Sequence, residues 1–176
     1  MKRTKQATET LQTGFSRNHA QKKLLPSDLR IYRQSVKTDL PYIQYEGVKM
    51  LFAEEGRGRL FINGREHPFE RGDSCVLFLY HFHRLSGAME APLKVVSIEL
   101  SHSAYLYIAN APCCQLTNIG TIHQMPFARF EELPFNRCME IIEELKLMAG
   151  DISFAYKMAL LIELFGRLYR QATGGA

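Results

Sequence analysis

Residues 52–85 read FAEEGRGRLFINGREHPFERGDSCVLFLYHFHRL, and this stretch decides the fold. Short apolar runs alternate in it with turn residues, of which Asn63-Gly64 and Arg71-Gly72-Asp73 are the clearest. Asn-Gly favours a tight hairpin because both central residues of that turn need a positive φ. Closely spaced short strands joined by such turns predict a β-sandwich or a β-barrel.

The same alternation of short apolar runs and turn residues continues on both sides of this stretch. We expect strands over residues 29–36, 42–54, 59–63, 74–80 and 93–101. After Pro134 the apolar spacing changes to the helical period, which predicts a helix over residues 135–149. Gly150 ends that helix, and Asp151 is expected to cap a second one over residues 152–171. The chain is therefore predicted to be mainly β with a C-terminal pair of helices.

Composition and charge exclude some classes of protein. Of the 176 residues, 46% are hydrophobic, yet no run approaches the roughly 20 apolar residues that a membrane helix needs. The N-terminus has no apolar block of the kind that makes a secretory signal, so a cytoplasmic location is expected. The net charge of +4 is uneven, because residues 1–37 hold nine Lys or Arg against two acids. We interpret the basic N-terminal arm as a solvated tail, although such an arm can also attract phosphate backbones.

The order of motifs in the central stretch resembles the N-terminal cupin domain of AraC-type transcription regulators. That family shows glycines, a short strand, a turn ending in Gly, another strand, a Gly-Asp pair, an apolar strand and a His-Arg pair. Here these are Gly56 and Gly58, residues 60–62, residues 63–66, Gly72-Asp73, residues 76–79 and His83-Arg84. Residues 92–101 are similar to the family's next strand, and the closing helices resemble its dimerisation helices. The resemblance covers residues 29–171.

This resemblance implies a cupin barrel, which is a double-stranded β-helix or jelly roll, followed by an antiparallel two-helix hairpin. The expected domains are a basic N-terminal arm (residues 1–28), the cupin β-barrel (29–130), a helical hairpin for dimerisation (131–172) and a linker-like tail (173–176).

The second metal-binding motif of cupins is kept only in part. It places Pro, Gly and His at fixed distances after an initial Gly, and counting from Gly72 puts them at Phe78, Tyr80 and His83. The histidine is therefore present and the two turn residues are replaced. The nearby pair His81-x-His83 shares one face of a strand but has no carboxylate partner.

The first metal-binding motif is lost. Aligned on Gly56, it places a Glu where Lys49 stands, and its two His fall on Ile43 and Tyr45, or on Tyr42 and Gln44 with the longer spacer. One histidine cannot build a catalytic metal site, which usually takes three protein ligands, and a lysine beside it opposes a cation. We expect no metal, no cofactor and no catalytic residue.

Alternation along residues 42–54 divides the side chains between two faces. The inner face is expected to carry Ile43, Tyr45, Lys49, Leu51 and Ala53. The outer face is expected to carry Val48, Met50 and Phe52, under the helices.

Effector contacts are expected from Tyr45, Lys49, His83, Arg84 and Glu99. Apolar walls with a few polar groups are typical of a small-molecule pocket, and the cationic groups here suggest a polar or anionic effector. Two other roles remain open, because Lys49 could extend to the barrel mouth and His83 could be a hydrogen-bonded structural histidine. If Lys49 lines the barrel, Lys49→Ala should alter effector affinity and leave dimerisation untouched.

The second helix is apolar on several faces, whereas a surface helix needs a single apolar stripe. One face can cover the barrel, and the other is expected to meet a second protomer or a further domain. The residues expected at this interface are Tyr156, Leu161, Leu164, Phe165 and Leu168. The alternative is a helix buried entirely within its own chain.

Together these observations predict the small-molecule-sensing and dimerisation domain of an AraC-type regulator, not an enzyme. The residues after Gln171 are too few for a helix-turn-helix unit, so DNA is expected to be bound only through a C-terminal domain that is not in this chain. The expected partners are a polar or anionic effector and a second copy, with no membrane. The alternatives are a cupin-fold isomerase, epimerase or metal-dependent oxygenase, which stoichiometric metal would favour, and a stand-alone metabolite-binding cupin.

Overall fold

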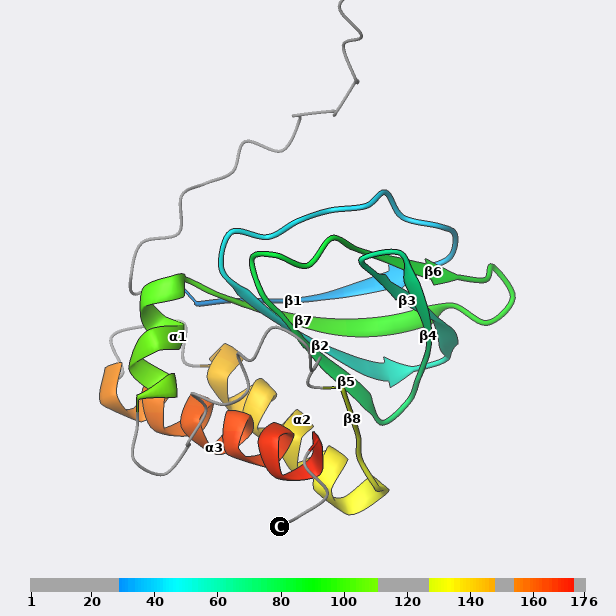
Figure 1. The fold of residues 1–176 in the computed structure, drawn as a ribbon. Helices are drawn as coiled ribbons and strands as arrows, with labels where there is room; N and C mark the ends of the chain where they lie inside the picture. Colours follow the sequence, from blue (N-terminus) through cyan, green and yellow to red (C-terminus); the bar gives the residue numbers. More distant parts are fainter. Residues whose placement is uncertain (1–28, 111–126, 148–153, 173–176) are drawn as a thin grey trace, which may run out of the picture.

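The computed structural model describes residues 29–110, 127–147 and 154–172, which form two β-sheets and three helices (Figure 1). The strands are β1 (Leu29–Val36), β2 (Val48–Glu55), β3 (Arg57–Ile62), β4 (Arg65–Glu70), β5 (Asp73–Leu77), β6 (His83–Gly87), β7 (Leu93–Leu100) and β8 (Phe127–Arg129). The helices are α1 (His102–Ala109), α2 (Glu132–Leu147) and α3 (Phe154–Ala172).

One sheet has five strands in the order β1-β7-β2-β5-β8, and the other has three in the order β4-β3-β6. All strand pairs are antiparallel. The inner faces of both sheets contribute to one apolar cluster, so the sheets enclose a common interior. This arrangement of strands followed by helices agrees with the predicted fold class.

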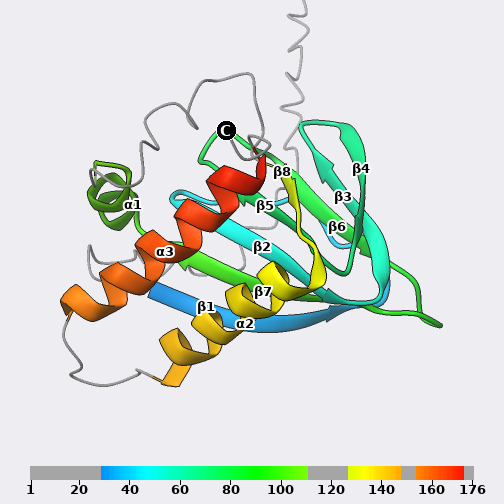
Figure 2. The ribbon, with the colours of Figure 1, turned by 90° about the horizontal axis from the view of Figure 1, so that it is seen from below.

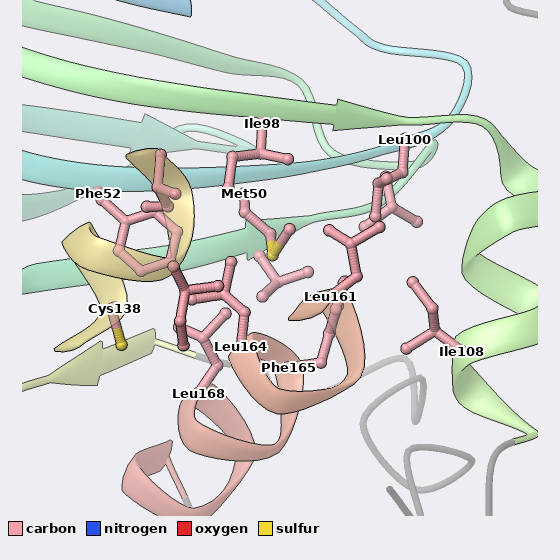
Figure 3. Packing of buried hydrophobic residues seen from close by; sticks show 14 of the residues in the cluster. Met50, Phe52, Ile98, Leu100, Ile108, Cys138, Leu161, Leu164, Phe165 and Leu168 are labelled. Atoms are coloured by element: carbon pink, nitrogen blue, oxygen red, sulfur yellow. The ribbon is translucent and has the colours of Figure 1, made fainter. Parts of the chain in front are cut away.

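The helices lie on the outer face of the five-stranded sheet (Figure 2). Val48, Met50 and Phe52 point outward from β2 into this layer, as the alternation predicts, and each is at most 1% exposed. Figure 3 shows Met50 and Phe52 packed with Ile98 and Leu100 of β7 against side chains of α3. Burial of this apolar face is the main force that holds the helices on the sheet. None of the described helices is both long and apolar enough to cross a membrane.

Four of the five residues assigned to a dimer interface lie in this core instead. Leu161, Leu164, Phe165 and Leu168 of α3 are at most 2% exposed and pack under the sheet (Figure 3). A side chain buried in its own chain leaves no surface for a partner, so their assignment to an interface is wrong. The fifth residue, Tyr156, is 43% exposed, and its hydroxyl donates to a carboxylate of α2.

The Asn63-Gly64 hairpin is confirmed as the turn between β3 and β4. Asn63 has a φ of 48° and Gly64 a φ of 81°, which are the positive values that the tight turn requires. Strands β4 and β6 were not expected from the sequence. Pro68 interrupts the β-like pattern of β4, and it is tolerated because β4 is an edge strand of its sheet.

The strand expected over residues 42–54 begins only at Val48. Ahead of it, Ile43 forms an isolated bridge with His83, in which each backbone N–H donates to the other residue's carbonyl at 2.8 and 2.9 Å. Gly47 lies where a Cβ atom would stand 2.1 Å from the carbonyl oxygen of Leu100. The chain therefore passes closely over the end of β7 before β2 begins.

Gly56→Ala is expected to cost about 2 kcal/mol of unfolding free energy, because it combines a strained positive φ with a backbone clash. Gly56 has a φ of 79°, and its Cβ would lie 2.1 Å from the Pro92 carbonyl oxygen. Gly64→Ala is the matched control, because Gly64 also has a positive φ but nothing lies within 4 Å of its Cβ position. Urea unfolding should show the larger loss for Gly56→Ala. Equal losses would mean that the close approach to Pro92 is unimportant.

Candidate functional site

Three polar side chains meet on the inner face of the five-stranded sheet. Lys49 of β2 lies opposite Glu99 of β7, with its Nζ 3.3 Å from Glu99 Oε1. The hydroxyl of Tyr32 in β1 accepts a hydrogen bond from Lys49 Nζ at 2.9 Å and donates one to Glu99 Oε1 at 2.8 Å. Lys49 is 3% exposed and Glu99 is 7% exposed. We call Tyr32, Lys49 and Glu99 the inner triad.

The triad is formed because three neighbouring strands place these residues side by side. Arg30, Glu99 and Lys49 are directly opposite one another in the β1-β7-β2 ladder, and Tyr32, Ser97 and Leu51 form the next row. Arg30 extends outward from its row, so its guanidinium is mostly exposed and lies 3.7 Å from Glu99 Oε2. Glu99 is thus buried on its Lys49 side and reaches toward solvent on its Arg30 side.

Ser97 and His83 lie in the same interior. Ser97 is fully buried, and its Oγ has no hydrogen-bond partner among the described residues. His83 of β6 is 2% exposed, and its Nδ1 also lacks a partner there. Burial and, to a smaller extent, the positive charge of Lys49 lower the pKa of His83 to about 3, against the opposing effect of a hydrogen bond with the His81 backbone. His83 is therefore neutral at pH 7.

Acidification from pH 7 to pH 5 is expected to lower the unfolding free energy through His83. Its folded pKa is about 3, against an ordinary value of 6.5. The unfolded chain therefore binds the extra proton first as the pH falls, and stability declines between pH 6.5 and pH 3. The loss at pH 5 is about 2 kcal/mol. Urea unfolding at both pH values should show it, and His83→Gln should reduce it. The exposed His102→Gln is the control, and an equal loss in His83→Gln and the parent protein would contradict the assignment.

Tyr45 lies at the mouth of the barrel, near the triad but not in it. It is half-buried and lines a hollow of about 400 Å³ together with Gln44, Glu46 and Leu79. The side chain of Gln44 donates to the carbonyl oxygen of Leu79, which joins the segment before β2 to the loop after β5. This mouth lies at the end of β2 where Lys49 stands, so Tyr45 and Lys49 share one end of the barrel.

Arg84 does not belong to this site. It lies opposite Phe61 on β3 and its guanidinium stacks 4.2 Å from that ring, on the outer face of the three-stranded sheet. It also pairs with Asp39 at 2.8 Å. His83 and Arg84 are consecutive residues of β6, so their side chains point to opposite faces. Arg84 therefore lies on the opposite face of the sheet from the inner triad and His83.

The sequence predicts that Tyr45, Lys49 and His83 converge inside the barrel and that Glu99 adds a contact, and the structure places Lys49, His83 and Glu99 in the interior. Tyr32, which connects two members of the triad, was missed. The alternation of residues 29–36 could have placed Tyr32 on the inner face with Val36, but it could not show which strand lies next to β1.

The residues present do not fit the metal centre of a metal-dependent cupin. Lys49 stands where that motif places a carboxylate, and its ammonium is already engaged with Glu99. Across residues 29–110, 127–147 and 154–172, no three His, Cys, Asp or Glu side chains come together in a way that could hold a metal ion.

Three similar solved structures illustrate what this chain resembles. The structure of ToxT from Vibrio cholerae matches 82% of this chain and 57% of its own, with a TM-score of 0.55 and 13% identity. Apo ToxT, as a variant from Vibrio cholerae strain SCE256, matches 86% of this chain and 58% of its own, with a TM-score of 0.60 and 9% identity. A Cupin 2 conserved barrel domain protein from Salinispora arenicola matches 44% of this chain and 66% of its own, at a TM-score of 0.40 and 15% identity.

At these identities the likeness to ToxT shows the fold alone. It confirms the predicted architecture, a cupin-type barrel followed by helices. The chain spans 57–58% of the length of these two ToxT chains. No protein-family model and no curated protein sequence matches the chain.

Proposed function

We propose that this chain is the small-molecule-sensing domain of an AraC-type transcription regulator, with the effector bound at the inner triad, Ser97 and His83. The observation that carries the proposal is the buried Lys49–Glu99 ion pair in an otherwise apolar interior. A buried ion pair is often no more stabilising than apolar residues of similar volume, so folding alone does not account for it. Apolar walls with a few polar groups are typical of a small-molecule site. The fold shared with ToxT, an AraC-family regulator with a cupin-like N-terminal domain, supports this function.

Strand β1 connects this site to the helices. Tyr32 points inward to the triad, and the next residue, Arg33, points outward. The guanidinium of Arg33 donates to Glu54 of β2 at 2.8 Å and also pairs with Glu143 of α2. An effector that moves Tyr32 also displaces Arg33 and with it α2. Such coupling requires the effector to favour one arrangement energetically.

The proposal includes a homodimer and DNA binding through a helix-turn-helix domain outside this chain. Because the apolar residues of α3 face the sheet, the interface is assigned to the outward side of the helices. Leu133 and Leu147 of α2 are 83% and 85% exposed, and at fourteen residues apart they lie close to the same side of the helix.

Fractionated metabolite extracts that raise the melting temperature of the chain should identify the effector. Lys49→Met/Glu99→Gln keeps the shape of the ion pair and removes both charges, so it should reduce that thermal shift and leave the sedimentation coefficient unchanged. The Arg84→Gln variant is the matched control, because Arg84 lies outside the site. A thermal shift that the double variant leaves intact, or that Arg84→Gln abolishes, would place the effector elsewhere.

A further inference from the structure

The charges of the effector site are already balanced. Lys49 and Glu99 carry opposite charges 3.3 Å apart, and Tyr32 hydrogen-bonds to both. An anion entering the site would gain attraction from Lys49 but would meet the carboxylate of Glu99 at a similar distance. A cation would instead be attracted by Glu99 and repelled by Lys49. Because attraction and repulsion act over similar distances, the two terms largely cancel.

Two uncharged groups on the inner faces of the sheets, Ser97 Oγ and His83 Nδ1, have no hydrogen-bond partner among the described residues. Ser97 lies opposite Tyr32 and Leu51, and Leu51 belongs to the inner apolar cluster, so Ser97 faces the interior. His83 lies opposite Ile62, another member of that cluster, and its pKa depends on the charge of Lys49. Both side chains therefore point into the barrel interior, as the inner triad does. A buried polar atom without a partner destabilises the protein, and a ligand group that hydrogen-bonds to it removes this cost.

The donor and acceptor inventory restricts what can satisfy these two atoms. The His83 ring is neutral near pH 7, so its unpartnered Nδ1 presents either a lone pair or an N–H group. The Ser97 hydroxyl can donate or accept. A carboxylate can only accept a hydrogen bond, whereas an alcohol or a primary amide can both donate and accept and so can satisfy His83 in either tautomer together with Ser97.

We propose that the effector of this chain is uncharged at its buried end and presents an alcohol or a primary amide to His83 Nδ1 and Ser97 Oγ. This inference rests on the proposed function and narrows the effector class, which the sequence left as polar or anionic. The inner triad then forms one wall of the site. Selectivity comes from the uncharged pair, Ser97 and His83.

Acetamide and acetate test this proposal, because they have nearly the same shape and differ in charge and in donor capacity. Each is titrated into the full chain while the side-chain nitrogen resonances of His83 are followed by NMR, with the exposed His102 as the internal reference. Acetamide should shift the His83 Nδ1 resonance, and acetate should not. Ser97→Ala removes a hydroxyl that has no partner among the described residues, so it should fold normally and weaken acetamide binding about tenfold.

A second variant reverses the selectivity. Glu99→Gln leaves the charge of Lys49 unbalanced, so this variant should bind acetate more tightly than the parent protein does. Stronger binding of acetate than of acetamide to the parent protein would overturn the inference and leave the sensor function standing. If neither probe moves the His83 resonance, the uncharged pair is closed to ligands and the inference fails. Failure of the sensor function itself would be seen separately, as metabolite fractions that produce no thermal shift in the parent protein.

Discussion

Lys49→Met is expected to lower the free energy of unfolding by about 3 kcal/mol, which is near the low end of the losses found when one partner of a buried ion pair is removed. The substitution keeps the apolar stem of the side chain but leaves the Glu99 carboxylate buried without its ammonium partner and removes a donor from Tyr32. Arg30 remains 3.7 Å from Glu99 Oε2 and moderates the loss. Urea unfolding at pH 7 measures this difference directly.

The double variant Lys49→Met/Glu99→Gln tests whether the loss in the single variants comes from leaving one charge unpaired. Glu99→Gln alone leaves Lys49 unpaired and should also destabilise the protein. With both charges removed, stability should return to within about 1 kcal/mol of the parent protein, because no buried charge is left uncompensated. Losses that simply add in the double variant would show that Lys49 and Glu99 do not interact.

Phe165→Ala is expected to lower the free energy of unfolding by about 3–5 kcal/mol, because it opens a cavity in the layer between the helices and the sheet. Phe165 is 1% exposed (Figure 3). Its ring centroid lies 6.0 Å from that of Tyr105 in α1. Thermal or urea unfolding followed by circular dichroism measures the change. Leu106→Ala in α1 is the control, because Leu106 is 46% exposed and its truncation should change stability by less than about 0.5 kcal/mol. Equal effects of the two variants would contradict the packing described.

The prediction of the fold succeeded where periodicity and turn chemistry agree. The Asn63-Gly64 turn and the alternation of Met50 and Phe52 with Lys49 and Leu51 fix the hairpin and the two faces of β2. Helix α1 was missed because an eight-residue helix has too few turns to show a period. Its one local signal is Ser101, whose Oγ accepts a hydrogen bond from the Ala104 N–H at the start of the helix.

The site was harder to predict because it depends on which strands are neighbours. Lys49 and Glu99 could each be placed on an inner face from alternation, but their pairing follows from the β2-β7 register. Arg84 was grouped with His83 as a motif, although consecutive strand residues point to opposite faces. The interface residues of α3 were misplaced because a pattern that is apolar on several faces cannot distinguish a partner protomer from the chain's own α1, α2 and sheet.

Among the strands that the structure describes, β1 is the edge of the five-stranded sheet and pairs only with β7, whereas β7 and β2 each lie between two strands. Displacing an edge strand disturbs one ladder of hydrogen bonds, so β1 has the lowest mechanical stiffness of the three strands that hold the triad. The most compliant wall of the barrel is thus the one that carries Tyr32 on its inside and Arg33 on its outside. A displacement of side chains inside the barrel is therefore expected to move β1 more than β7 or β2, and to reach α2 through Arg33.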